Sequence, residues 1–188
     1  FILLVFIYRS PIFWVFPLLA VFFAEGLVRG IGSLLVDAGV VVVCSSGNLG
    51  LLGYGTITSP GNSPKVITVG SVSDRGTVDK LDDIVSTFSS RGPTLVDHYV
   101  KPDLLAPGNR LYSTIAAGTV LPNSFPERVT SFGGKETSYM VLSGTSQAAA
   151  VVAGTVALML DKSPTLSPAT VKARLMRSAR KPNLGSPF

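Results

Sequence analysis

The stretch SGTSQAAAVVAGTVALML, Ser143 to Leu160, places Ser146 between a Gly-Thr pair and a run of small apolar residues. Small residues let a tight turn open into a closely packed helix, and a serine exposed at that point can act as a nucleophile. Its hydroxyl attacks a carbonyl only when a base takes its proton, usually a histidine oriented by a carboxylate. The simpler interpretation is that Ser146 only helps Thr145 to cap a core helix. The chemistry of Ser146 therefore depends on the residues that the fold brings to it.

A second polar side chain follows an apolar run. Asn48 in SSGNLG comes directly after Gly47 and the run VVVVC, so we expect its amide at the carboxyl edge of a sheet. An asparagine in a turn is the simpler interpretation. Asn48 and Ser146 nevertheless fit one task, because acyl transfer makes an anion of the carbonyl oxygen, and donors aimed at that oxygen supply a large part of the rate. The Asn48 amide would be one donor, and the Ser146 backbone N–H, at the positive end of a helix, the other.

The chain around these residues alternates between helical and strand patterns. A helix is expected from Ala24 to the terminator Gly39, with apolar residues at helical spacing at Leu27, Ile31, Leu34 and Ala38. Strands are expected in VVVVCSS (40–46), KVITVGSV (65–72), IVSTFSS (84–90) and KPDLLAPG (101–108). Two more helices are expected, one from Thr145 to about Asp161 and one from its N-cap Ser167 to about Arg180. This order predicts an α/β fold with a largely parallel sheet.

Residues 1–23 form an apolar tract that is long enough to cross a bilayer, since a span needs roughly 20 apolar residues. Arg9 lies near its middle, and Pro11 and Pro17 are expected to break or kink a single helix. The run FILLVFIY (1–8) equally fits a strand that is buried on both faces. Three interpretations therefore stay open for residues 1–23: a membrane span, a buried strand and a miscalled end of the chain. Residues 24–188 form the remaining domain.

Composition argues against several functions. Six of the sixteen basic residues, which give a net charge of +5, lie in residues 162–181. Most of them fall on one face of an expected helix with Val171 and Leu175 on the other face, as in a solvated surface helix. No aromatic residues lie among them, which argues against nucleic-acid binding. The single cysteine, Cys44, allows no internal disulfide, and no Cys/His cluster has metal-ligand spacing.

Five segments, in order, resemble the subtilisin-like serine proteases (subtilases) between about Ala24 and Lys181. SGTSQAAAVVAG is similar to the nucleophile motif of that family, and VVVVCSSGNLG resembles its oxyanion-hole segment. PKVITVGSV, FSSRGP and KPDLLAPG are similar to its intervening core strands. The resemblance implies a three-layer subtilisin-like fold, incomplete at the N-terminus. It also implies a serine endopeptidase that cleaves peptide or protein substrates through an acyl-enzyme at Ser146, with Asn48 in the oxyanion hole.

The resemblance further implies a set of substrate-binding residues: Ser46, Gly47, Thr58, Ser59, Gly61, Gly144 and Thr145. Ala150 stands where the family usually has proline, and TSPG (58–61) diverges from the family's pocket wall, so cleavage preference does not follow from the sequence. The implied mechanism needs no cofactor. Calcium is frequent in the family, but no ligand cluster is identified in the sequence. Members of the family are commonly exported, so the resemblance implies a secreted or extracytoplasmic protein.

The catalytic base is not evident. Asp37, His98 and Ser146 stand in the order Asp, His, Ser that subtilases use, but order is not geometry. Asp37 is expected to end a helix rather than a strand, and His98, the single histidine, lies in a polar loop. We therefore expect His98 to be a surface residue far from Ser146, and the base and its carboxylate to lie upstream of Phe1, so that these 188 residues are inactive alone. The other interpretation is a non-catalytic subtilase-like binding module, with or without a membrane tether.

Overall fold

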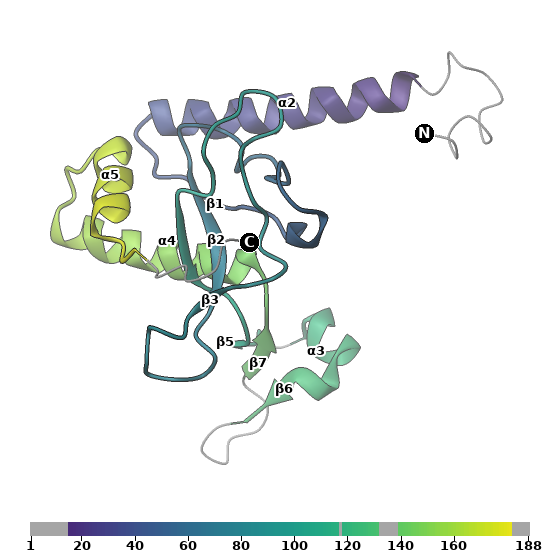
Figure 1. Cartoon of the computed structure of the whole chain (residues 1–188), viewed down its shortest axis with the longest axis vertical. Helices are drawn as coiled ribbons and strands as arrows, with labels where there is room; N and C mark the ends of the chain where they lie inside the picture. Colours follow the sequence, from purple (N-terminus) through teal and green to yellow (C-terminus); the bar gives the residue numbers. More distant parts are fainter. Residues whose placement is uncertain (1–14, 117, 132–138, 182–188) are drawn as a thin grey trace.

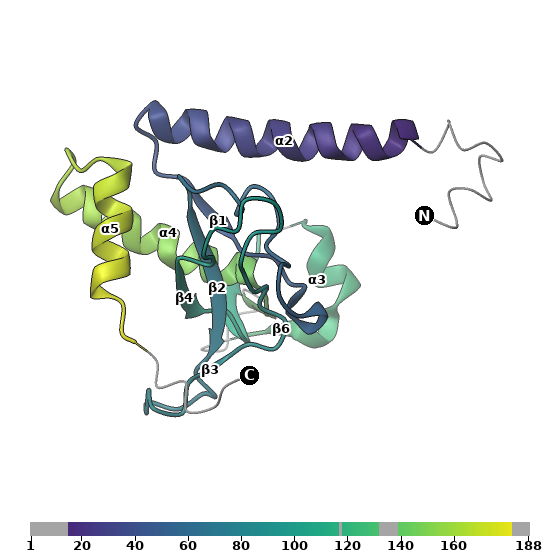
Figure 2. The same ribbon diagram turned by 45° about the horizontal axis from the view of Figure 1, so that its top comes forward.

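The computed structural model describes residues 15–116, 118–131 and 139–181. A four-stranded sheet lies at the centre of the fold. The long helices α2 (Val15–Asp37) and α4 (Thr145–Lys162) lie on opposite sides of it (Figures 1 and 2). This arrangement confirms the expected α/β fold.

The main sheet is parallel at its centre. β1 (Val43–Ser45) and β4 (Leu104–Pro107) both run parallel to β2 (Ile67–Ser73). The fourth strand, β3 (Ile84–Val85), has two residues and runs antiparallel to β2. The strand predicted for residues 84–90 is therefore wrong beyond Val85. The chain turns there because the Ser89 N–H donates to the carbonyl of Ser86.

The core lies between β2, β4 and α4. Buried residues of the two strands pack against one face of α4 and against α5 (Pro168–Ser178). The residues of this core are Ile67 and Val69 of β2, Ala106 of β4, Ala148, Val152 and Val156 of α4, and Val171 of α5. The α4 members recur every four residues, which is the spacing of one helix face. As predicted, α5 begins after the N-cap Ser167, whose side chain accepts a hydrogen bond from the Thr170 N–H.

A second, antiparallel sheet was not predicted from the sequence. Its strands stand in the order β5 (Leu111–Thr114), β7 (Tyr139–Leu142) and β6 (Val129–Thr130). The short helix α3 (Val120–Ser124) and the 3-10 turn η2 (Pro126–Arg128) connect β5 to β6. These strands are too short to give a clear alternating pattern. Only two residues separate β7 from α4, so this sheet leads directly to Ser146.

Helix α2 begins earlier than the sequence pattern indicates. It was predicted from Ala24 and runs from Val15. Pro17 does not break the helix. It lies in the first turn, where backbone N–H groups have no partner within the helix, so the missing N–H of proline costs no hydrogen bond. The helix ends at Asp37, and Gly39 follows with a φ of +90°, as predicted for a terminator. The strand considered for residues 1–8 lies outside the described residues.

The side of α2 that contacts the rest of the protein is polar. Glu25 accepts a hydrogen bond from Asn62, Arg29 pairs with Asp97, Ser33 bonds Ser63, and Asp37 pairs with Lys65. The apolar stripe that predicted the helix is not its packed side, because Leu27, Ile31 and Leu34 are 53%, 49% and 68% exposed. Among the described residues, α2 is the one helix whose length and composition would allow it to cross a membrane.

Candidate active site

Ser146 lies in the first turn of α4. Thr145 is the first residue of that helix and is buried, whereas Ser146 is exposed. The Ser146 hydroxyl makes no hydrogen bond with any residue that the structure describes. Gly144 precedes the helix and provides no side-chain cap, but its N–H donates to the carbonyl of Gly108 at 2.8 Å. The start of α4 therefore offers an exposed, unbonded hydroxyl on a fixed backbone.

Asn48 lies in the loop between β1 and the 3-10 turn η1 (Gly50–Leu52) and contacts this helix end. Its Oδ1 atom accepts two hydrogen bonds from Thr145, one from the backbone N–H at 2.9 Å and one from the hydroxyl at 3.0 Å. The Thr145 N–H is one of the helix donors that has no partner inside the helix. Asn48 thus provides from another element the cap that Gly144 lacks.

These bonds fix the orientation of the Asn48 amide. A backbone N–H can only donate, so the side-chain atom that accepts from Thr145 is the oxygen, and Nδ2 is left as the donor of the amide. A Cβ atom placed on Gly144 would lie 3.5 Å from Asn48 Nδ2 and 3.7 Å from the Ser146 nitrogen. The Asn48 amide nitrogen and the Ser146 backbone nitrogen thus both lie within 4 Å of the point where a Gly144 side chain would begin. The Oε1 atom of Gln147 lies nearer to that point, at 2.6 Å.

Gly47 holds the Asn48 loop against α4. Its N–H donates to the Thr145 hydroxyl at 3.2 Å, and the same hydroxyl donates to Asn48. Its φ is +106°, which glycine adopts without strain. A Cβ atom at Gly47 would lie 2.8 Å from the side-chain oxygens of Ser90 and Thr58. Glycine is therefore required here by both backbone conformation and space.

The predicted substrate-binding residues divide into two groups. Ser46 and Gly61 are buried beneath the loop, and the Thr58 N–H donates to the Ser46 carbonyl at 3.0 Å. Gly47 lies against Thr58, whose hydroxyl would be 2.8 Å from a Cβ atom at Gly47. Ser59 differs, since its hydroxyl donates to the Glu25 carbonyl of α2 at 3.2 Å. The structure therefore links Ser46, Gly47, Thr58 and Thr145 by contacts, whereas the Ser59 side chain bonds α2.

Asp37, His98 and Ser146 do not form a triad. Asp37 ends α2 and receives hydrogen bonds from Lys65 at 2.5 and 2.7 Å. His98 is exposed in a turn with a φ of +54°, and its side chain makes no hydrogen bond or ion pair with the described residues. His98 is therefore not hydrogen-bonded to Ser146 and has no carboxylate oriented behind it.

A buried charge cluster lies at the start of β4, where sequence reasoning did not expect one. The Lys101 ammonium donates to the Val66 carbonyl, the Thr68 hydroxyl and the Asp103 carboxylate at 2.7 to 3.1 Å. Burial lowers the pKa of Lys101 to about 8, although the neighbouring Asp103 carboxylate opposes this effect. Lys172 of α5 pairs with the same carboxylate at 3.0 Å. Oxygens that could bind a cation are thus occupied by ammonium groups.

Lys172 corrects the interpretation of α5 as a purely solvated cationic face. Its side chain is 15% exposed, and it donates to the carbonyls of Pro64 and Val66 at 2.8 Å. The signal available in the sequence was the Lys-Pro-Asp triplet at the start of a strand. No group of three or more histidine, cysteine, aspartate or glutamate residues is placed to hold a metal within residues 15–116, 118–131 and 139–181.

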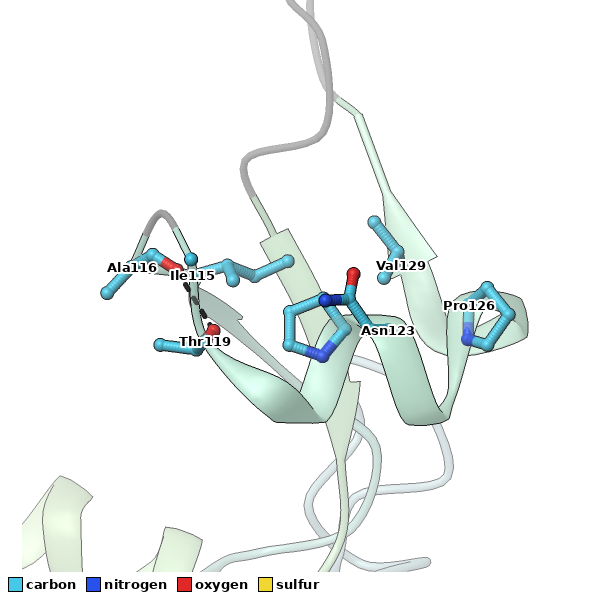
Figure 3. A pocket seen from close by; sticks show the side chains of 8 residues that line it. Ile115, Ala116, Thr119, Asn123, Pro126 and Val129 are labelled. Atoms are coloured by element: carbon cyan, nitrogen blue, oxygen red, sulfur yellow. Dashed lines mark hydrogen bonds between the residues drawn. The ribbon is translucent and has the colours of Figure 1, made fainter.

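A cavity of about 420 Å³ lies in the second sheet, away from the residues described above. Figure 3 shows it between the end of β5, α3 and the start of β6, with Ile115, Asn123 and Val129 around it. The Thr119 hydroxyl donates to the Ala116 carbonyl at its rim (Figure 3). Neither Asn48 nor Ser146 lines this cavity, so it is separate from the candidate active site.

The parallel sheet backed by α4 is a subtilisin-like fold. The solved structure of Sphericase aligns with a TM-score of 0.62 and 26% identity, over 82% of this chain and 44% of that one. The self-cleaved protease domain of PatA aligns with a TM-score of 0.55 and 25% identity, over 81% of this chain and 46% of that one.

Residues 24–187 match the Subtilase family, and the chain belongs to that family. Serine protease AprX of Bacillus subtilis (strain 168) is 42% identical over 145 residues, which is 77% of this chain and 31% of that protein. Subtilisin DY of Bacillus licheniformis is 35% identical over 152 residues, which is 80% of this chain and 43% of that protein. The chain thus spans less than half the length of each of these relatives.

Proposed function

We propose that Ser146 is the nucleophile, and Asn48 the side-chain oxyanion donor, of a serine endopeptidase that acts on peptide or protein substrates. The observation that carries this proposal is the 2.9 Å bond from the Thr145 N–H to Asn48 Oδ1. Because that bond uses the amide oxygen, Asn48 Nδ2 stays available as a donor, and it lies near the Ser146 N–H beside Gly144. An acyl-transfer site needs such a pair of donors, already oriented, beside an exposed hydroxyl.

In this reaction the Ser146 oxygen adds to the carbonyl carbon of the scissile peptide and loses its proton to a base. The carbonyl oxygen becomes an anion that accepts from Asn48 Nδ2 and the Ser146 N–H. Collapse expels the amine, which takes up the proton and leaves an acyl group on Ser146. Water then attacks that ester and restores the hydroxyl. The mechanism requires no cofactor.

We propose that His98 is not the base, because it is exposed and its side chain has no hydrogen bond or carboxylate partner among the described residues. We propose that a histidine and a carboxylate outside these 188 residues complete the site, as they do in the family motifs that this sequence lacks. By the same resemblance, the complete protein acts outside the cytoplasm.

Labelling with a fluorophosphonate tests the assignment. The protein as its gene encodes it should be labelled, Ser146→Ala should abolish the label, and the exposed control Ser178→Ala should keep it. The 188-residue chain alone should resist labelling because it lacks the base. Rapid labelling of that chain at Ser146 would contradict the assignment of the base to another segment. If the encoded protein folds but stays unlabelled, a non-catalytic binding module is the better description.

A further inference from the structure

The first ten residues of α2, 15–24, project beyond the rest of the protein (Figures 1 and 2). The polar contacts of α2 begin at Glu25, whose carbonyl and carboxylate accept from Ser59 and Asn62. They recur along one side of the helix at Arg29, Ser33 and Asp37. The helix therefore has a docked part from Glu25 onward and a projecting part before it.

The projecting part is apolar, and all of its residues except Pro17 and Leu18 are exposed. Its sequence, VFPLLAVFFA, contains no charged or hydrogen-bonding side chain. The exposed fractions of Phe16, Leu19, Val21, Phe22 and Phe23 are 63%, 58%, 64%, 69% and 74%. At 100° per residue these five positions, together with the exposed Ala20 and Ala24, are distributed over most of the circumference of the helix. A helix that is apolar all round is normally buried in a protein core or a membrane.

A second copy of the chain docked along this helix would cover one face and leave the opposite face in water. A bilayer surrounds a helix and covers every face at once. We propose that residues 15–24 insert into the hydrocarbon of a lipid bilayer and that the boundary with water lies at Glu25.

The dimensions of α2 limit how far it enters. Ten helical residues rise about 15 Å, which is half of a hydrocarbon core of roughly 30 Å, so residues 15–24 occupy one leaflet. The remaining residues stay outside, because insertion would separate Glu25, Arg29 and Asp37 from their partners and place their charges in lipid. The part of α2 from Glu25 to Asp37 thus stays outside the hydrocarbon, and the protein body rests at the surface.

Flotation of the 188-residue chain with vesicles of neutral phosphatidylcholine tests this insertion. The chain should float with the vesicles, and it should still do so in 0.5 M NaCl, because the interaction is apolar. Replacing Phe16, Phe22 and Phe23 with serine should weaken binding by about tenfold for each phenylalanine removed. The matched control is Leu51→Ser with Leu52→Ser, two residues that are 82% and 75% exposed but lie outside α2. The control should bind as the unchanged chain does.

The position of the boundary between lipid and water along α2 can be measured separately with spin labels. In a Cys44→Ser background, spin labels at Val21→Cys and Leu34→Cys should report different surroundings, because these positions lie on either side of Glu25. The label at position 21 should be accessible to oxygen dissolved in lipid, and the label at position 34 to a water-soluble nickel complex. If both labels lie in lipid, α2 crosses the bilayer and the boundary is wrong.

Three other outcomes would overturn the insertion itself. Unchanged flotation of the triple phenylalanine variant would assign the binding to another segment. Binding that requires anionic lipid and disappears in salt would assign it to basic residues. If the unchanged chain does not float but forms dimers that the triple variant dissociates, the partner of α2 is a second copy. Flotation involves no enzymatic readout, so these results are independent of peptidase activity.

Discussion

Asn48 caps a helix that begins 97 residues further along the chain, through two hydrogen bonds from Thr145 to Asn48 Oδ1. One amide therefore has two tasks. Its oxygen holds the start of α4, and its nitrogen is the proposed oxyanion donor. Substitutions that keep one atom and remove the other separate these tasks.

Asn48→Asp keeps an oxygen that accepts from Thr145 but replaces the donor nitrogen with a second, negatively charged oxygen. We expect stability to be unchanged or slightly higher, since a carboxylate at a helix N-terminus is favourable by about 0.3–1 kcal/mol. We expect kcat to fall by at least the hundred- to thousandfold already known for loss of this donor in subtilisin. Urea unfolding of the chain and ester hydrolysis by the encoded protein measure the two effects.

Asn48→Ala is the matched comparison, because it removes both atoms. The Thr145 N–H then loses its cap, so stability should fall by about 1–2 kcal/mol together with the loss of activity. Equal stabilities for the two variants would show that Asn48 Oδ1 does not hold α4. Full activity in Asn48→Asp would show that Nδ2 is not the oxyanion donor.

Gly47→Ala should disturb the loop that carries Asn48. The added Cβ would lie 2.8 to 2.9 Å from atoms of Ser90 and Thr58 in a backbone conformation with a φ of +106°. We expect a loss of about 2–4 kcal/mol, from backbone strain together with overpacking. Gly53→Ala is the control, because Gly53 has a φ of +93° but no atom within 4 Å of an added Cβ. If both variants lose the same stability in urea unfolding, the close packing around Gly47 contributes nothing.

The elements with strong local signals could be predicted from the sequence. The α4 pattern, the Ser167 cap of α5 and the apolar runs of β2 and β4 correspond to the structure closely. The proximity of Asn48 to Ser146 also follows from local signals, since a loop after a parallel strand and a helix start meet at one edge of a sheet. The resemblance to the family added the roles proposed for both residues.

The features that could not be predicted depend on contacts between distant residues. The cap of α4 comes from a side chain 97 positions away, and no local pattern reveals such a partner. Lys172 has the spacing of a solvated residue but extends to carbonyls more than a hundred residues earlier. Pro17 suggests a break by composition, whereas its effect depends on where the first turn begins. The strands β5 to β7 are stabilised by pairing rather than by their own sequences.

His98→Asn should leave the proposed activity unchanged. His98 is exposed, and its side chain bonds no described residue. Asparagine tolerates the left-handed backbone conformation of this residue, so the turn should persist. The rate of fluorophosphonate labelling of the encoded protein should stay within about twofold of the unchanged protein, well below the 10²–10⁴-fold that a general base contributes. A loss of a hundredfold or more would identify His98 as the base.

The buried Lys101 should give the chain a pH-dependent stability. The unfolded chain keeps the lysine proton up to the ordinary pKa of 10.5, whereas burial lowers the pKa in the folded state to about 8. Between these values the unfolded state binds more protons, so the free energy of unfolding should rise with pH over this window, by on the order of 1–3 kcal/mol. Lys101→Met removes the titrating group. Between pH 8 and 10.5 the unchanged chain should therefore gain stability relative to this variant. Taking that difference by urea unfolding cancels the tyrosines and the lysines that lie away from this cluster, whereas Lys172, which shares the Asp103 carboxylate, stays coupled to Lys101. A difference that is constant across the window would show that Lys101 keeps its proton in the folded state, held by the Asp103 carboxylate at 2.7 Å.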